Sequence, residues 1–333
     1  MTSAPGAIPL DPPVLLAPMA GITDLPFRDL VSGFGAGLVV SEMVASQEMV
    51  QGKPGVRERA ELGLDRSRTS VQLAGRDATW MARAARQVAD QGARVIDINM
   101  GCPAKKVVGG LSGSALMRDP DHALRLIEAV VAAVDLPVTL KMRLGWDDDS
   151  HNAADIARRA EAAGVRMIVV HGRTRCQFYK GQADWAAIAP VKQAVTVPVI
   201  ANGDIISSAS ARQALALSGA DGVMIGRGAQ GQPWLPAQIA HDLFGVAAPE
   251  VPVGPKFCDF VSGHYQSILN FYGNMLGLRV ARKHLGWYMD SAATPAVLRQ
   301  HVLRGTDPGA VLALLPQALA PDHRAARIET EAA

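Results

Sequence analysis

Cysteine is scarce in this chain and shows no paired spacing. The 333 residues include three cysteines, Cys102, Cys176 and Cys258, which lie far apart and form no Cys-x-x-Cys sequence. Scattered cysteines in odd number argue against a disulfide framework and against a cysteine-based zinc site. His-Glu-x-x-His, Gly-x-Ser-x-Gly and Walker sequences are missing too, which counts against metal-dependent hydrolysis, acyl transfer and nucleotide hydrolysis. We therefore expect free thiols and no bound metal.

Long apolar segments and a strong net charge are also missing. No apolar run approaches the roughly twenty residues that span a bilayer. The first thirteen residues lack the basic stretch and apolar segment of a signal peptide. We expect a soluble, cytoplasmic protein with no membrane partner. A net charge of +2 is too small to predict nucleic-acid binding by itself, because that depends on local clusters of Lys and Arg.

The chain does contain eight short apolar runs, separated by stretches of helical character. Continuous apolar runs are typical of parallel strands that are buried on both faces. Helices are predicted over 79–91, 121–134 and 153–163, each ending near Gly or Pro before the next run. Eight such units predict a closed (β/α)8 TIM barrel, with a doubly wound open sheet as the alternative. The predicted strands are 14–17, 38–41, 70–73, 95–98, 138–140, 167–170, 199–201 and 222–225.

The pattern changes after the eighth run. A segment with Pro249, Pro252 and Pro255 indicates a linker, and the residues that follow are helical in character. We expect the TIM barrel over 1–245, a linker over 246–255, a small all-helical C-terminal domain over 256–320 and a tail over 321–333. The aromatic residues of the small domain are expected mainly in its core.

Polar residues follow almost every predicted strand. In a TIM barrel such residues meet at one rim, where catalytic groups lie. Each has an ordinary structural alternative: Gln72 could cap a helix, His171 could be a core histidine, and Lys141 could pair with Glu42 or Asp204. Their convergence at one rim favours a site. The residues are Pro18 to Ala20, Glu42, Gln72, Asn99 with Cys102, Lys141 with Arg143, His171 with Arg173, Asn202 to Asp204, and Gly226 with Arg227.

The last two strand ends have the composition of a phosphate site. Glycines in Asn202-Gly203-Asp204 and Gly226-Arg227-Gly228 let backbone N–H groups approach an anion. Residues 226–231 also match Gly-x-Gly-x-x-Gly, but this match follows the eighth strand and no acidic residue lies about twenty positions later, so a dinucleotide fold is rejected. A phosphate-bearing cofactor without a metal is either pyridoxal phosphate, with Lys141 as Schiff base, or flavin mononucleotide.

Five sequence blocks resemble the tRNA-dihydrouridine synthase family. Residues 282–288, Arg-Lys-His-Leu-Gly-Trp-Tyr, are similar to the C-terminal motif of its bacterial B-type branch. The resemblance extends from about residue 15 to about residue 288, and its most specific part is Asn-x-Gly-Cys-Pro. The five blocks are Ala17 to Asp24, Asp97 to Pro103, Lys141 to Arg143, His171 to Thr174, and Gly226 with Arg227.

The resemblance implies a flavoenzyme that reduces the uracil C5=C6 bond in tRNA, in the D-loop, with FMN as cofactor and NADPH (or NADH) as hydride donor. It implies that Cys102 supplies the proton. It also implies tRNA as partner. We expect a monomer. The cofactor-binding residues would be Pro18, Met19, Ala20, Gln72, Lys141, His171, Asn202, Gly203, Asp204, Gly226 and Arg227. The RNA-binding residues would be Asn99, Lys105, Arg143, Arg173, Arg279, Arg282 and Lys283.

Two other functions compete with this interpretation. The first is a flavin barrel that acts on a free pyrimidine, such as a dihydropyrimidine or dihydroorotate dehydrogenase. Arg279, Arg282 and Lys283 share one predicted helix face, which argues for RNA instead. The second is a non-catalytic RNA-binding protein that kept the barrel, against which Cys102 and Lys141 argue.

Overall fold

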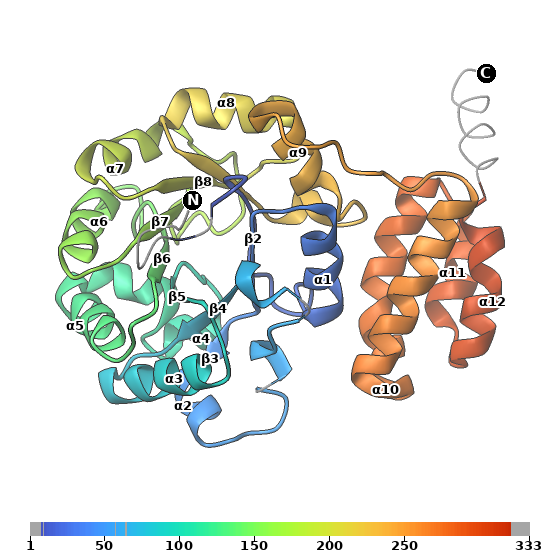
Figure 1. Ribbon diagram of the computed structural model, residues 1–333, viewed down its shortest axis with the longest axis horizontal. Helices are drawn as coiled ribbons and strands as arrows, with labels where there is room; N and C mark the ends of the chain where they lie inside the picture. The colour runs from blue at the N-terminus through green and yellow to red at the C-terminus, as the bar shows by residue number, and fades with distance from the viewer. Residues whose placement is uncertain (1–7, 9, 57, 64, 321–333) are drawn as a thin grey trace. The chain divides into compact units, whose positions relative to one another are not determined.

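The computed structural model describes residues 8, 10–56, 58–63 and 65–320, so the predicted tail over 321–333 lies outside the described residues. All eight predicted strands are present and parallel (Figure 1). Pairing of Val39 with Thr69 and of Val40 with Ser70 closes the sheet, which confirms the TIM barrel and excludes the open sheet. The barrel strands are β1 (Val14–Leu16), β2 (Leu38–Val40), β4 (Thr69–Ala74), β5 (Val95–Met100), β6 (Val138–Arg143), β7 (Met167–His171), β8 (Val199–Asn202) and β9 (Gly222–Ile225).

A further short strand, β3 (Val44–Ala45), pairs with the end of β4 and was not predicted from the sequence. Two residues are too few to give a periodic pattern. The helices that follow the strands of the barrel are α1 (Leu25–Phe34), α3 (Ala78–Asp90), α5 (Pro120–Val131), α6 (Ala153–Ala162), α7 (Ala189–Ala194), α8 (Ser208–Ser218) and α9 (Leu235–Phe244). After β2 comes the five-residue helix α2 (Ser46–Val50).

The interior of the barrel has an apolar side and a polar side. Strands β1, β2, β7, β8 and β9 contribute an apolar cluster, whereas buried polar side chains lie along β4, β5 and β6. Burying polar groups costs free energy unless they form hydrogen bonds. The polar side is therefore where a site is expected. The apolar cluster consists of Leu15, Ala17, Leu38, Val40, Met167, Val169, Ile200 and Met224.

A second compact unit contains residues 249–320 together with 229–234, while 235–248 pack with the barrel. Residues 229–234 belong to this second unit, whereas the prediction placed them in the barrel domain over 1–245. The reason is aromatic packing: the Trp234 ring lies 6.2 Å from the Phe257 ring and 5.9 Å from the Phe260 ring, both edge-on. A side chain at Gly231 would meet the backbone of Trp287.

The second unit is helical, as predicted. It consists of α10 (Pro255–Ala292), α11 (Ala296–Arg304) and α12 (Pro308–Ala318), with a kink in α10 at Gly273 (φ 73°, ψ 165°). Its core includes Tyr265, Leu285 and Tyr288, which confirms that aromatic residues of this unit serve mainly in packing. In the described part of the chain, no helix is both long and apolar enough to cross a membrane.

Candidate active site

Lys141 lies at the centre of the rim formed by the strand ends. It is almost fully buried, and its Nζ donates to Asn202 Oδ1 at 3.0 Å, which joins β6 to β8. Asn202 Nδ2 donates in turn to the carbonyl of Met224 on β9 at 2.8 Å. Burial lowers the pKa of Lys141 to about 8, helped by the nearby charge of Arg143. The rim therefore holds a cation that is easily neutralised.

Cys102 lies just beyond β5, in a segment that hydrogen bonds hold at both ends. Asn99 Oδ1 accepts from the backbone N–H groups of Gly101 at 3.3 Å and Cys102 at 3.0 Å. The Cys102 carbonyl accepts from Ser114 N at 3.1 Å and Ser114 Oγ at 2.9 Å. Cys102 is half-buried. The backbone that carries the thiol is thus fixed at both ends, and the residue as a whole keeps some exposed surface.

Gln72 and Asn99 form part of a buried polar chain below this segment. Gln72 Oε1 accepts from Asn99 Nδ2 at 2.7 Å, and Gln72 Nε2 donates to Asp97 Oδ2 at 2.6 Å. Gln72 has no exposed surface. Asp97 and Thr139 were not among the predicted site residues. Asp97 precedes Asn99 by two positions on one strand, so their side chains share a face, and this spacing is a signal that sequence reasoning could have used.

Asp204, Arg173 and His171 form a second group at the rim. The Arg173 guanidinium donates to Asp204 Oδ2 at 2.6 Å and to Asp204 Oδ1 at 3.0 Å. Arg173 Nη1 also lies 3.3 Å from His171 Nε2. Because a guanidinium has no acceptor, His171 Nε2 accepts and the imidazole is neutral with its proton on Nδ1. Burial and the surrounding cations lower the pKa of His171 well below its usual value.

Arg143 and Arg173, predicted to bind substrate, are both 1% exposed. Arg143 donates to the carbonyls of Gly101, Thr174 and Phe178 at 2.8 to 2.9 Å. Arg173 donates to the carbonyls of Lys180 and Gly181. In this structure both guanidinium groups hold loops together, and their contact with substrate stays a prediction. Sequence alone could not reveal this, because the carbonyls they bind belong to irregular loops.

The loops after β8 and β9 approach each other closely through glycine. Gly203 has φ 113° and Asp204 has φ 53°, both in the left-handed region. A Cβ at Gly203 would lie 2.7 Å from His171 Cδ2, and one at Gly228 would lie 2.5 Å from the carbonyl oxygen of Ile205. Only glycine permits this approach. Arg227 is exposed beside them, 3.5 Å from Asp204 Oδ1.

The remaining predicted residues take different positions. Met19 forms a turn with Ile22 and Thr23, and Gly21 N donates to the Glu42 carboxylate, so the ends of β1 and β2 are tied together. Pro18 and Met19 are half-buried, Ala20 is exposed, and Gly226 is half-buried after β9. Lys105 is exposed at the start of the short helix α4 (Lys105–Gly109).

The predicted basic face of the helical unit is only partly available. Arg279 and Lys283 are exposed on α10. Arg282 is half-buried, and its Nη2 donates to the carbonyl of Gly305 at 3.3 Å. Tyr179 is a rim residue that the sequence analysis missed: it is 52% exposed and its ring lies 5.4 Å from the Arg227 guanidinium carbon. Nothing in its loop sequence signals this placement.

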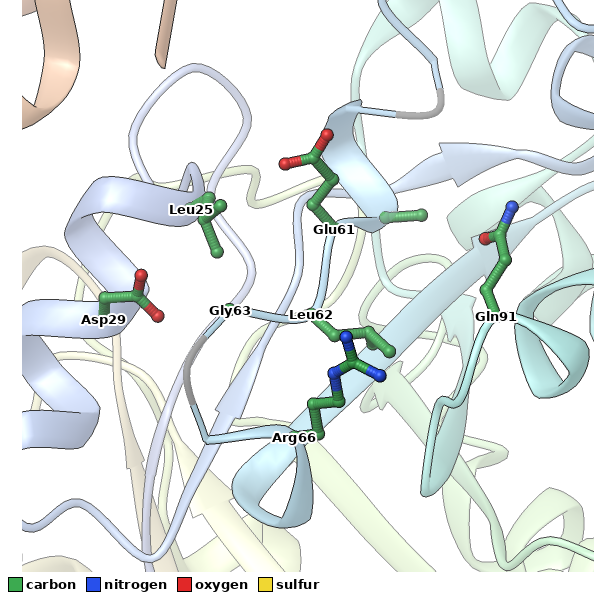
Figure 2. Close-up of a pocket in the computed structure, with 8 residues that line it drawn as sticks. Leu25, Asp29, Glu61, Leu62, Gly63, Arg66 and Gln91 are labelled. Carbon is green, nitrogen blue, oxygen red and sulfur yellow. The ribbon is translucent and has the colours of Figure 1, made fainter. Parts of the chain in front are cut away.

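A cavity of about 550 Å³ lies elsewhere on the barrel unit, beside α1 and the segment before β4 (Figure 2). None of the predicted site residues lines it. Its lining is mixed, with Asp29, Glu61 and Arg66 around Leu25 and Leu62. Among the residues that the structure describes, no group of three or more His, Cys, Asp or Glu side chains is placed to hold a metal. The strand-end rim is therefore where the chemistry-bearing side chains gather.

Solved structures with a similar fold include two enzymes. One is histamine dehydrogenase from Rhizobium sp. 4-9, with a TM-score of 0.51 and 12% identity, covering 76% of this chain and 48% of that chain. The other is a 2-naphthoyl-CoA reductase, with a TM-score of 0.54 and 13% identity, covering 68% of this chain and 50% of that chain. This chain spans about half the length of each. At such low identity the likeness shows the fold alone.

Curated relatives are far more similar and match over nearly their whole length. A probable tRNA-dihydrouridine synthase of Rhodobacter capsulatus is 69% identical over 319 residues, covering 96% of this chain and 98% of the relative. The tRNA-dihydrouridine synthase B of Xanthomonas campestris pv. campestris is 48% identical over 309 residues, 93% of each. The family model described as Dihydrouridine synthase (Dus) matches residues 15–322. The chain therefore belongs to the dihydrouridine synthase family, whose members are flavin-dependent oxidoreductases.

Proposed function

We propose that this protein uses FMN, reduced by NADPH (or NADH), to convert specific uridines in the D-loop of tRNA to 5,6-dihydrouridine. The observation that carries the proposal is the placement of a thiol and a buried cation on neighbouring strands. Asn99, which holds the Cys102 backbone, pairs across the sheet with Lys141. One strand end thus offers a proton and the next offers positive charge.

The residues at the rim fit a flavin. Among the described residues, Asn202 is the hydrogen-bond partner of the Lys141 ammonium, which has three N–H donors. The other N–H donors of Lys141 can bind a flavin ring, which becomes anionic when it is reduced. The positive charge of Lys141 beside the ring would then favour reduction of the flavin. Gln72 and His171 would lie along the same rim, with the 18–20 segment on its β1 side. The glycine-lined loops at 202–204 and 226–228, with Arg227, would hold the phosphate.

When bound and reduced, a flavin at this rim would supply hydride chemistry, here toward C6 of the uracil. The task of Cys102 is to deliver a proton to C5. A thiol carries a proton that it can deliver as a general acid. Asn99 would hold the uracil edge with its remaining N–H. The buried Arg143 fixes the Gly101 carbonyl and thereby the direction of the segment that bears the thiol.

A uridine within folded RNA must leave its stack to reach a barrel rim. Exposed positive charges are needed to hold the surrounding RNA. Lys105 on the barrel unit and Arg279 and Lys283 on the helical unit are exposed and would serve this purpose. A tRNA substrate implies action in the cytoplasm, and we propose that the protein acts as a monomer.

The test is flavin reoxidation under anaerobic conditions. The compound released from denatured holoenzyme is first identified by mass spectrometry. The enzyme is then reduced with NADPH and mixed in a stopped-flow instrument with tRNA that lacks dihydrouridine, or with the same concentration of free uridine. We expect FMN, and reoxidation that is fast with tRNA and absent with uridine. Fast reoxidation by free pyrimidine would favour the small-molecule dehydrogenase, and a colourless protein would favour the non-catalytic alternative.

A further inference from the structure

A chain of three buried side chains links the interior of the barrel to the backbone of Cys102. Asp97 accepts from Gln72, Gln72 accepts from Asn99, and Asn99 accepts from the N–H groups of Gly101 and Cys102. Asp97 also accepts from Thr139 Oγ1 at 2.5 Å. The three side chains come from β4 and β5 and are each less than 10% exposed. Water therefore has little access to these hydrogen bonds and does not readily replace one of their partners.

The direction of the hydrogen bonds is fixed independently at both ends. An ionised carboxylate only accepts, so Gln72 must turn its Nε2 toward Asp97 and its Oε1 toward Asn99. A backbone N–H only donates, so Asn99 must turn its Oδ1 toward Gly101 and Cys102. Both requirements select the same orientation of the two amides. Burial raises the pKa of Asp97, and the hydrogen bonds from Gln72 and Thr139 together with the charge of Lys141 limit that rise. The backbone N–H groups at the Cys102 end select this orientation of the two amides by themselves.

We propose that Asp97 is a positioning residue for the reaction, acting through Gln72 and Asn99 on the Cys102 segment. The inference rests on the proposed role of Cys102. With its Oδ1 committed to the backbone, Asn99 has one N–H bound to Gln72 and one N–H left to face the rim. Asp97 thus fixes both the position of the Cys102 backbone and the direction of the Asn99 N–H group that an incoming uracil would meet.

The variants that test this proposal differ in what they leave at position 97. Asp97→Leu removes the acceptor for Gln72 and breaks the chain. Asp97→Asn keeps an acceptor, because the oxygen of the introduced amide accepts from Gln72 and its nitrogen donates to the amphoteric Thr139 hydroxyl. Thr139→Val is the matched control, since it removes a hydrogen bond to the same carboxylate but leaves the chain intact.

Two readouts report on the Cys102 segment in the holoenzyme. The first is the alkylation rate of the Cys102 peptide by iodoacetamide, resolved from the Cys176 and Cys258 peptides by mass spectrometry. The second is the single-turnover rate with tRNA after reduction of the flavin. We expect Asp97→Leu to raise alkylation and lower turnover, each about tenfold, as for one lost buried hydrogen bond. Asp97→Asn should remain within about threefold and Thr139→Val within about twofold of wild type.

Equal alkylation in Asp97→Leu and Thr139→Val would overturn the proposal. So would an Asp97→Asn variant as impaired as Asp97→Leu, because the charge beside Lys141 would then matter and the hydrogen-bond chain would not. The alkylation readout requires neither RNA nor NADPH. Wild-type enzyme inactive on tRNA would therefore refute the proposed function while leaving this comparison readable.

A second pair keeps the proposal testable if Asp97→Leu does not fold. Asn99→Asp places a carboxylate against Gln72 Oε1, and Gln72 can turn its Nε2 toward that carboxylate only by presenting Oε1 to Asp97. Adding Asp97→Asn allows the whole chain to reverse: the amide introduced at position 97 donates to Gln72, and Gln72 donates to the carboxylate introduced at position 99. We expect Asp97→Asn to raise the unfolding temperature of Asn99→Asp, although it lowers that of wild type. Additive lowering in the double variant would overturn the proposal.

Discussion

The guanidinium of Arg173 holds the carboxylate of Asp204 with two hydrogen bonds, from Nη2 to Oδ2 at 2.6 Å and from Nη1 to Oδ1 at 3.0 Å. This pair joins the loop after β7 to the loop after β8. The hydrogen bond from Ala183 N to Asp204 Oδ2 at 2.8 Å adds a third contact. These interactions, led by the Arg173 hydrogen bond, oppose the cost of burial and lower the pKa of Asp204. Asp204 is thus held as an anion at the end of one of the two loops proposed to bind phosphate, next to Arg227.

Arg173→Met should therefore destabilise the barrel and weaken flavin binding together. Breaking a buried ion pair costs about 3 kcal/mol when one partner is left behind, and Asp204 is partly exposed, so this is an upper estimate. Arg173→Lys keeps the positive charge but loses the bidentate hydrogen bonding of the guanidinium. Its stability and FMN affinity should therefore lie between those of Arg173→Met and of wild type. Urea unfolding and an FMN titration measure both effects. Unchanged FMN affinity in Arg173→Met would separate this pair from the cofactor site.

Cys102→Ala should keep bound flavin and its reduction by NADPH but lose dihydrouridine formation at least about a hundredfold, the usual contribution of a positioned general acid. The matched control is Cys176→Ala, which removes an exposed thiol and should leave the rate unchanged. Single-turnover reoxidation of the flavin by tRNA measures the step. Turnover of Cys102→Ala at the wild-type rate would remove Cys102 from the mechanism.

Flavin reduction should depend on the charge of Lys141. Its pKa is lowered by burial to about 8, so the ammonium loses its proton as pH rises through that value. A bound anion would move this loss upward. The rate of flavin reduction by NADPH should therefore fall at or above pH 8, by up to about tenfold per unit. Lys141→Met should be slow at every pH and lack this dependence. A wild-type rate that is flat between pH 7 and 9.5 would contradict the assignment.

Arg279 and Lys283 should differ from Arg282 in what they contribute. Replacing Arg279 and Lys283 with Ala should weaken tRNA binding and reduce the slope of log affinity against log salt by about 1.5, because two phosphate contacts are lost. Arg282→Ala should mainly lower stability, since its guanidinium supports the Gly305 carbonyl. Binding titrations between 50 and 300 mM salt, roughly the range where counterion release is measured, separate the two. If Arg282→Ala reduces the salt-dependence slope and the Arg279 and Lys283 replacements do not, then Arg279 and Lys283 do not bind the RNA phosphates.

The helical unit should become less stable in mild acid. His264 and His284 meet edge-on in its core with ring centres 4.8 Å apart, and burial lowers both pKa values, that of His284 to about 3. In the unfolded chain each would bind a proton near pH 6.5. Stability is therefore complete above about pH 6.5 and is lost as pH falls below it, by up to about 1.4 kcal/mol per histidine per unit.

Hydrogen exchange of α10 peptides at pH 7 and pH 5, corrected for intrinsic rates, measures this loss. His284→Leu should reduce the pH dependence by about half, because one of the two sites is removed. The exposed His301 on α11 is the matched control, and His301→Gln should retain the full dependence. Equal protection of α10 at both pH values in wild type would contradict the prediction.

The sequence predicted the barrel well because its strands are buried on both faces. A run such as 167–170 is apolar at every position, and the polar residue that follows it, His171, marks the rim. All eight strands were placed on this basis. The short strand β3 (Val44–Ala45) was missed because pairing with β4, rather than its own composition, makes it a strand.

The sequence indicated which residues lie at the candidate site, but it did not indicate how buried they are or which groups they contact. Residue type shows that Arg143 is a cation at a strand end, but its burial depends on the carbonyls of Thr174 and Phe178, which come from a distant loop. The same holds for 229–234, which pack in the helical unit through Trp234. Such contacts depend on tertiary structure, and no local pattern encodes them.

The most direct test of the central claim is the dihydrouridine content of tRNA. Transfer RNA that lacks the modification is incubated with purified protein and NADPH, digested, and mapped by mass spectrometry. We predict a gain of two mass units at one or more D-loop uridines with wild-type protein, and none with Cys102→Ala. Unmodified tRNA after incubation with flavin-loaded, NADPH-reduced wild-type protein would contradict the account.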